Sequence, residues 1–135
     1  MDRRILLVAI AALAGASITA QAHHSWGAVY DGGREVTELV ATVVSQHSRR
    51  PHDNVAVTIT NELGEAEAWT VQWRGPRGRD RDQDANRYDF NVGDEVLITG
   101  RIARNESDKL IQMTTLVRPS DGWTVTARQG RGGRR

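Results

Sequence analysis

Residues 54–73 read NVAVTITNELGEAEAWTVQW, and this stretch decides the fold class. Apolar and polar residues alternate on both sides of a glycine-containing turn at residues 61–64. One face of the two runs consists of Val55, Val57 and Ile59, then Glu67, Trp69, Val71 and Trp73. Alternation of this kind is typical of half-buried strands, and two such runs around a short turn predict a β-hairpin.

Further strands are predicted on both sides of this hairpin. Residues 35–44 are rich in β-branched side chains, and short apolar or alternating runs follow at 96–102, 110–117 and 123–126. The turn Val92-Gly93-Asp94-Glu95 leads into the 96–102 run, where we expect Gly100 to relieve crowding at a sharp bend. Five or six short strands predict an all-β fold, best matched by a small OB-like barrel, with a small β-sandwich as the alternative.

The first 22 residues have the pattern of a secretory signal peptide. Two arginines precede an apolar run at residues 5–14, which is shorter than the about 20 residues that span a bilayer. The small residues Ala20 and Ala22 suit cleavage after Ala22. The alternative interpretation of the first 22 residues is a membrane anchor or a buried helix. We therefore expect a periplasmic or secreted protein with no membrane span after cleavage. The chain has no cysteine, so no disulfide stabilises it after export.

The rest of the chain is expected to form one domain. Its parts are a histidine-containing segment at 23–34, an OB-like barrel at 35–127 and a basic, disordered tail at 128–135. The barrel carries an insert at 74–87 with five arginines and three aspartates, which is too polar to form a core element. Removal of Asp2, Arg3 and Arg4 with the signal peptide leaves 16 basic and 16 acidic residues. This balance argues against nucleic acid as a partner.

Three of the four histidines are candidate metal ligands. His23 and His24 directly follow the expected cleavage site, so the α-amine and the ring of His23 could chelate a metal together. His52, next to Pro51, could supply another imidazole. Such all-nitrogen sites favour copper(II), with zinc and nickel as alternatives. His47 has no motif around it and is expected to be a solvated turn residue.

The position of cleavage changes the expected chemistry. Cleavage after Ala20 would leave Gln21-Ala22-His23, in which a third-position histidine binds copper(II) or nickel(II) through the amine, two amides and the ring. That square-planar site needs no folded domain. A further alternative is that the histidines only order the N-terminus and bind no metal.

A competing hypothesis is an interaction module without a metal. In this interpretation Trp69 and Trp73 form an aromatic barrel face that binds a glycan or a periplasmic partner protein, assisted by Arg77 and Arg79 of the insert. This hypothesis requires Trp69 or Trp73 to be exposed. The alternative is that both tryptophans are buried in the core. No enzyme activity is predicted, because the sequence has no cysteine nucleophile, no nucleophile elbow and no phosphate-binding glycine loop.

Several of these motifs together resemble a family of small exported bacterial proteins, DUF6152, whose members share an A-H-H-S-F/W start, an N-P-H turn and a P-G-D-x-V-x-V-x-G turn. The matching segments here are Ala22-His23-His24-Ser25-Trp26, Tyr30-Asp31, Pro51-His52, Trp69, Gly75-Pro76 and Val92-Gly93-Asp94-Glu95-Val96. The chain departs from the pattern at Arg50, at Asp53-Asn54 and in the Arg/Asp-rich insert. The resemblance implies a secreted single domain and no particular activity.

Overall fold

A computed structural model describes residues 25–49, 52–75 and 88–128 of the chain. The elements in these ranges are α2 (Trp26–Tyr30), β1 (Glu35–Val43), β2 (Asp53–Thr60), β3 (Ala66–Trp73), β4 (Glu95–Ile102), the 3-10 helix η2 (Glu106–Asp108), β5 (Leu110–Arg118) and β6 (Trp123–Thr126). The six predicted strands are all present. The expected signal-peptide helix and residues 129–135 of the expected basic tail lie outside the described ranges, whereas Arg128 lies within them. Within those ranges, none of the helices has the length and apolar character needed to cross a bilayer.

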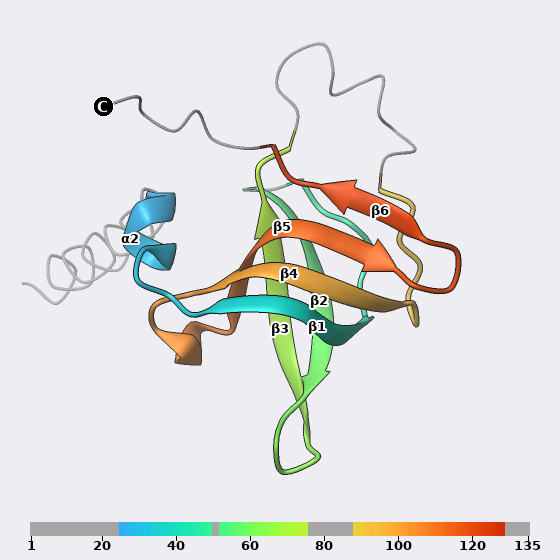
Figure 1. Cartoon of the computed structure of the whole chain (residues 1–135), viewed down its shortest axis with the longest axis horizontal. Helices are drawn as coiled ribbons and strands as arrows, with labels where there is room; N and C mark the ends of the chain where they lie inside the picture. Colours follow the sequence, from blue (N-terminus) through green and yellow to red (C-terminus); the bar gives the residue numbers. More distant parts are fainter. Residues whose placement is uncertain (1–24, 50–51, 76–87, 129–135) are drawn as a thin grey trace, which may run out of the picture.

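The strands form one sheet that closes into a barrel (Figure 1). Their order is β3-β2-β1-β4-β5-β6, and all neighbours in this series are antiparallel. A parallel pairing of β3 with β5, from Thr70–Leu110 to Gln72–Gln112, joins the two sides. The result is a closed five-stranded barrel with β6 as an extra strand. The predicted OB-like barrel is confirmed, and closure rules out the two-sheet sandwich.

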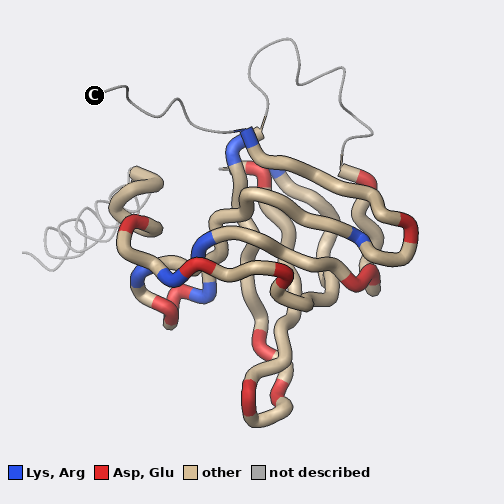
Figure 2. The backbone as a smooth tube through the Cα atoms, viewed as in Figure 1, with Lys and Arg blue, Asp and Glu red and all other residues tan. Residues whose placement is uncertain are grey.

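The barrel interior is filled by the residues that the alternating pattern singled out. Val55, Val57, Val71 and Val96 are fully buried, and Trp73 is 1% exposed. Their partners along each strand point outward, as the period of two requires. The β2–β3 hairpin extends beyond the barrel body, and Figure 2 shows acidic residues along this extension.

Two local features were not predicted. Residues 26–30 form the short helix α2, whose first turn is capped by the Ser25 hydroxyl accepting from the amide of Ala28 at 3.2 Å. Strand β1 has a bulge between Val36 and Leu39, and Glu38 in it has a φ of 51°. The bulge explains why residues 35–44 alternate imperfectly.

Gly100 allows β4 and β5 to approach closely where their register shifts between Thr99 and Gly100. A Cβ atom at position 100 would lie 2.1 Å from the carbonyl oxygen of Gln112 and 3.0 Å from the Cα of Met113. Only glycine fits there, because both contacts are with backbone atoms. The expectation that Gly100 relieves crowding is confirmed, and the crowding arises where the register of β4 and β5 shifts.

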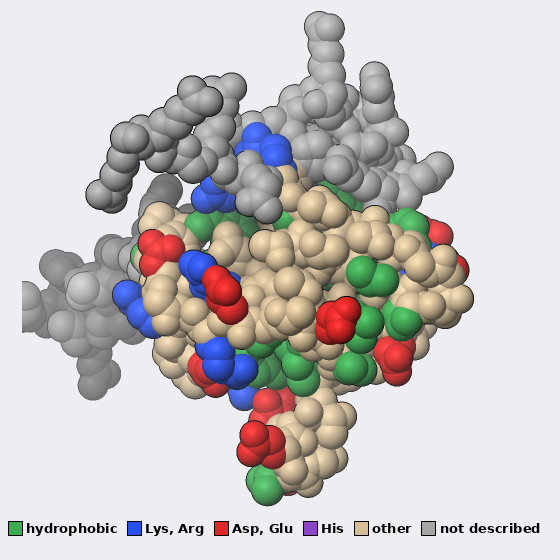
Figure 3. Space-filling model, in the orientation of Figure 1, with side chains coloured by type: hydrophobic (Ala, Val, Ile, Leu, Met, Phe, Trp, Pro, Cys, Tyr) green, Lys and Arg blue, Asp and Glu red, His purple; other side chains and the backbone are tan. Residues whose placement is uncertain are grey.

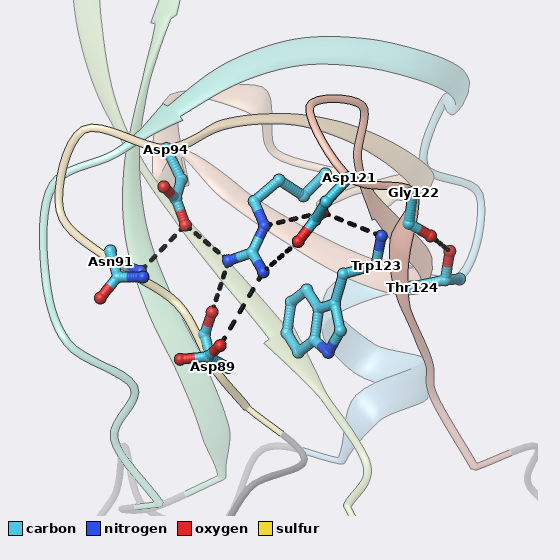
Figure 4. A network of polar contacts seen from close by, with 8 residues as sticks. Asp89, Asn91, Asp94, Asp121, Gly122, Trp123 and Thr124 are labelled. Carbon is cyan, nitrogen blue, oxygen red and sulfur yellow. Dashed lines mark hydrogen bonds and ion pairs between the residues drawn. The ribbon is translucent and has the colours of Figure 1, made fainter.

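Arg118, at the end of β5, ties the connection before β4 to the turn before β6 (Figure 4). Its guanidinium donates to both carboxylate oxygens of Asp121, at 3.0 and 2.8 Å, and to Asp94 at 2.9 Å. It also donates to the carbonyl of Asp89 at 2.7 Å. The bidentate geometry with Asp121 fits the planar fork of arginine, which lysine cannot reproduce.

This network makes the free energy of unfolding depend on pH in the acidic range. The hydrogen bonds and charge of Arg118 lower the pKa of Asp121 from 3.8 to about 2 in the folded state. The contribution of Asp121 to stability is therefore complete above about pH 4 and disappears as the pH falls toward 2. We expect Arg118→Met to make the free energy of unfolding less pH-dependent between pH 4 and 2, as measured by urea unfolding.

Arg101→Met is the matched control, because it removes an arginine from a more exposed ion pair with Glu35. This control should keep the wild-type slope between pH 4 and 2. An unchanged slope in Arg118→Met would show that Asp121 does not titrate as described.

Candidate functional site

The helix α2 packs against the barrel wall through aromatic contacts near the start of β2 and the end of β3. The Trp26 ring stacks on Tyr30 with centroids 5.4 Å apart and packs against His52 at 4.7 Å. The guanidinium of Arg74, just after β3, lies 5.6 Å from the centroid of Trp26. The buried Tyr30 hydroxyl donates to Gln72 at 2.8 Å, and burial raises its pKa, so it remains a donor at neutral pH. These contacts fix the N-terminal end of the described chain beside His52.

The imidazole of His52 is available to a ligand. The residue is exposed, and within the described ranges its ring makes no hydrogen bond. Its backbone carbonyl accepts from the side-chain amide of Asn54 at 2.7 Å, which holds the loop just before β2. His52 therefore presents a ring next to Trp26 while its own backbone is fixed.

Two of the three predicted metal ligands, His23 and His24, lie outside the described residues. In residues 25–49, 52–75 and 88–128, no group of three or more histidine, aspartate and glutamate side chains is placed to hold a metal ion.

A second cluster surrounds His47 and includes the first residue of β2, Asp53, and the last residue of β3, Trp73. The Nε2 of His47 is 2.8 Å from the Oδ1 of Asp53, and the ring packs against Trp73 at 5.4 Å and Tyr88 at 4.3 Å between centroids. The side chains of His47 and Asp53 are only 13% and 9% exposed. The expectation that His47 is a solvated turn residue is wrong, because its ring completes an aromatic layer at the end of the core.

The environment of His47 favours its neutral form. Burial lowers the pKa of His47, and the hydrogen bond to Asp53 only partly opposes this effect. A neutral ring that donates from Nε2 to the carboxylate leaves Nδ1 unprotonated. This cluster is an ordered histidine–aspartate pair rather than a free cation.

The His47–Asp53 pair was missed, although the sequence contained a signal for it. Asp53 continues the inward-facing series of Val55, Val57 and Ile59, and a carboxylate on the inner face of a strand requires a partner. Gly75 belongs to the same arrangement, because a Cβ there would lie 1.7 Å from the Oδ2 of Asp53. The partner could not be identified from sequence, since His47 reaches Asp53 across a loop.

The predicted aromatic binding face is wrong. Trp69 and Trp73 are 8% and 1% exposed, because both belong to the inward-facing set of β3 with Val71. The Nε1 of Trp69 donates to Glu67 at 3.3 Å, and its ring contacts the ammonium group of Lys109 at 4.8 Å. Neither indole presents a surface to a glycan or a protein partner. The other two predicted ligand-binding residues, Arg77 and Arg79, lie outside the described ranges.

Comparisons with known proteins give a family but no activity. A family model described as a family of unknown function, DUF6152, matches residues 10–112, well over half of the chain. No curated protein matches the chain, and no solved structure matches it.

Proposed function

The chain belongs to the DUF6152 family of unknown function, and we propose that it is an exported accessory protein that binds copper(II) through its N-terminal histidines. In this proposal the signal peptide is cleaved after Ala22, and the α-amine and ring of His23 chelate the metal. His24 and His52 supply further imidazoles. The protein acts in the periplasm or outside the cell as a metal-binding module.

The contact between Trp26 and His52, at 4.7 Å between ring centroids, is the observation that carries the proposal. His24 and His23 precede Trp26 by two and three residues. A chain spans at most about 3.6 Å per residue, so the Cα atoms of His24 and His23 are within about 7 and about 11 Å of that of Trp26. Both histidines are therefore within reach of the exposed His52 ring.

The donor set favours copper among the available metals. An α-amine has a pKa near about 8, so it can release its proton to a metal at neutral pH, and neutral imidazoles need to lose none. Copper(II) stands highest in the divalent series for nitrogen ligands, above nickel and zinc. The alternative without a metal is weakened by the burial of Trp69 and Trp73, because its aromatic face is absent.

Copper(II) titration by calorimetry tests the proposal with four proteins, namely the chain beginning at His23, two forms altered at the site and one control variant. The chain beginning at His23 should bind one copper(II). We expect an added glycine before His23 to weaken binding at least tenfold, because the amine then leaves the chelate ring. The variant His52→Ala should weaken binding by about tenfold, equivalent to about 1.4 kcal/mol. Glu62→Ala, at the tip of the hairpin, is the control and should bind like wild type.

Each result has a separate meaning. Unchanged affinity after the glycine extension would refute chelation by the amine of His23. Unchanged affinity in His52→Ala alone would restrict the site to the N-terminal segment and exclude His52 as a ligand. Intact mass of the exported protein should give His23 as its first residue.

Copper(II) should also quench the fluorescence of Trp26, since its ring packs against His52. The variant Trp26→Phe should lose most of this quenching, because Trp26 is the tryptophan whose ring packs against His52 among the described residues.

A further inference from the structure

A polar cleft of about 700 Å³ lies beside α2, on the outer surface of β1, β4 and β5. One wall of the cleft contains Arg74 and Arg128. Asp31, at the end of α2, also lines the cleft. The floor is formed where β1, β4 and β5 pair, around Gly100 and Arg101. Figure 3 shows charged side chains gathered on this side of the molecule, around a hollow near α2.

Arg74 and Arg128 form a pair of neighbouring cations at the cleft. The backbone amide of Arg128 donates to the carbonyl of Arg74 at 3.1 Å, so β6 brings the two residues together from distant parts of the chain. Figure 2 shows two basic segments side by side at the barrel end where β3 and β6 finish. In the ranges that the structure describes, neither guanidinium has a carboxylate partner. An acidic group bound at this wall could pair with either guanidinium and accept bidentate hydrogen bonds.

The floor of the cleft offers neutral hydrogen-bonding groups. Thr37, Thr99, Thr114 and Gln112 all line it. The Thr114 hydroxyl donates to the carbonyl of Thr99 at 3.0 Å, which leaves its oxygen able to accept from a ligand. Arg101 is already paired with Glu35 at 2.8 Å, so the pair contributes the donors of Arg101 and the acceptors of Glu35 with little net charge. This part of the cleft therefore suits hydroxyl groups better than a second anion.

We propose that this cleft binds a small hydroxylated ligand with one acidic group, either a carboxylate or a phosphate. The acidic group lies between Arg74 and Arg128, and hydroxyl groups of the ligand bond to the threonine and glutamine floor. A bare phosphate ion fills only a small part of about 700 Å³, whereas organic ligands usually occupy pockets of about 300–1,000 Å³. Binding in the cleft requires no copper. The cleft and the proposed copper site are neighbours, because the guanidinium of Arg74 lies over the Trp26 ring.

Two-dimensional amide NMR of the full mature chain with EDTA present tests the cleft without any metal. The probes are glucuronate for the carboxylate, glucose 6-phosphate for the phosphate, and glucose and inorganic phosphate as the two halves. We expect saturable shifts at the amides of Gly100, Gln112 and Arg128 with one or both acidic sugars. Glucose alone and inorganic phosphate alone should bind at least tenfold more weakly.

The double variant Arg74→Gln/Arg128→Gln should weaken binding of the acidic sugar at least tenfold, while Arg34→Gln should change it less than twofold. Arg34 is a matched control because it is an exposed arginine paired with Glu106 and does not line the cleft. Thermal unfolding of each variant checks that the fold is retained. Binding by only one acidic sugar would identify the acidic group.

Three results would overturn the proposal. These are the absence of shifts with both acidic sugars, equal binding of inorganic phosphate, and unchanged binding in the double arginine variant. None of them bears on the copper proposal, because EDTA removes the metal and no histidine is altered.

Discussion

Replacing Trp73 with alanine is expected to lower the free energy of unfolding by about 3–5 kcal/mol, as for other fully buried aromatic residues. The indole is 1% exposed and packs against Tyr88 at 5.3 Å and Phe90 at 6.0 Å between centroids. It also covers His47. The free energy of unfolding of a domain of this size is typically only about 5–15 kcal/mol, so this substitution removes a large share of the total stability.

Urea unfolding followed by circular dichroism measures this loss. The variant Trp73→Phe should cost much less, because it keeps a ring and removes a buried indole N–H that has no hydrogen-bond partner in the described chain. Leu63→Ala, 83% exposed at the hairpin tip, should stay within about 0.5 kcal/mol of wild type. A loss below about 1 kcal/mol in Trp73→Ala would contradict this packing. In the same variant, water next to His47 should raise the pKa of that ring toward its ordinary value.

Gly100→Ala is the second substitution with a large expected effect, a loss of about 3 kcal/mol. A single added methyl group would lie 2.1 Å from a backbone carbonyl oxygen of β5, and backbone atoms cannot rotate away as a side chain can. The two strands would have to separate at the register shift, which would disturb the floor of the cleft as well.

Thermal and urea unfolding of Gly100→Ala should be compared with Gly27→Ala. The added Cβ at position 27 would contact only the mobile end of the Asp31 side chain, at 2.9 Å, and alanine favours the helix. We expect Gly27→Ala to be neutral or slightly stabilising. Equal stability of the Gly100 variant and wild type would show that β4 and β5 are not in close contact there.

The fold could be predicted from sequence because short-range patterns determine each strand. Alternation placed Val55, Val57 and Val71 inside, and the turns at Gly64 and Gly93, both with positive φ, separated the strands. Closure into a barrel was predicted from the number of strands, from the long insert after the third and from the turn at Gly93-Asp94 into the fourth. Helix α2 was missed because five residues are too few to give a helical period.

The candidate sites were harder to predict because they depend on contacts between distant segments. No spacing rule connects His47 with Tyr88, or Arg74 with Arg128, and both pairs exist only because the barrel closes. The aromatic face failed for the opposite reason. Trp69 and Trp73 follow the inward alternation of β3, so the local pattern already placed them in the core.

The way in which the barrel closes has a kinetic consequence. Strand β1 pairs with β4 between residues as far apart as Glu35 and Arg101, and β3 meets β5 only through residues 70–72 and 110–112. Such long-range pairing lengthens the search for the native arrangement, and barrels of this kind fold in milliseconds to seconds rather than microseconds. Until β5 is in place, strand edges are open to other chains. Partners that hold the unfolded chain during this interval would determine how much of it reaches the native state.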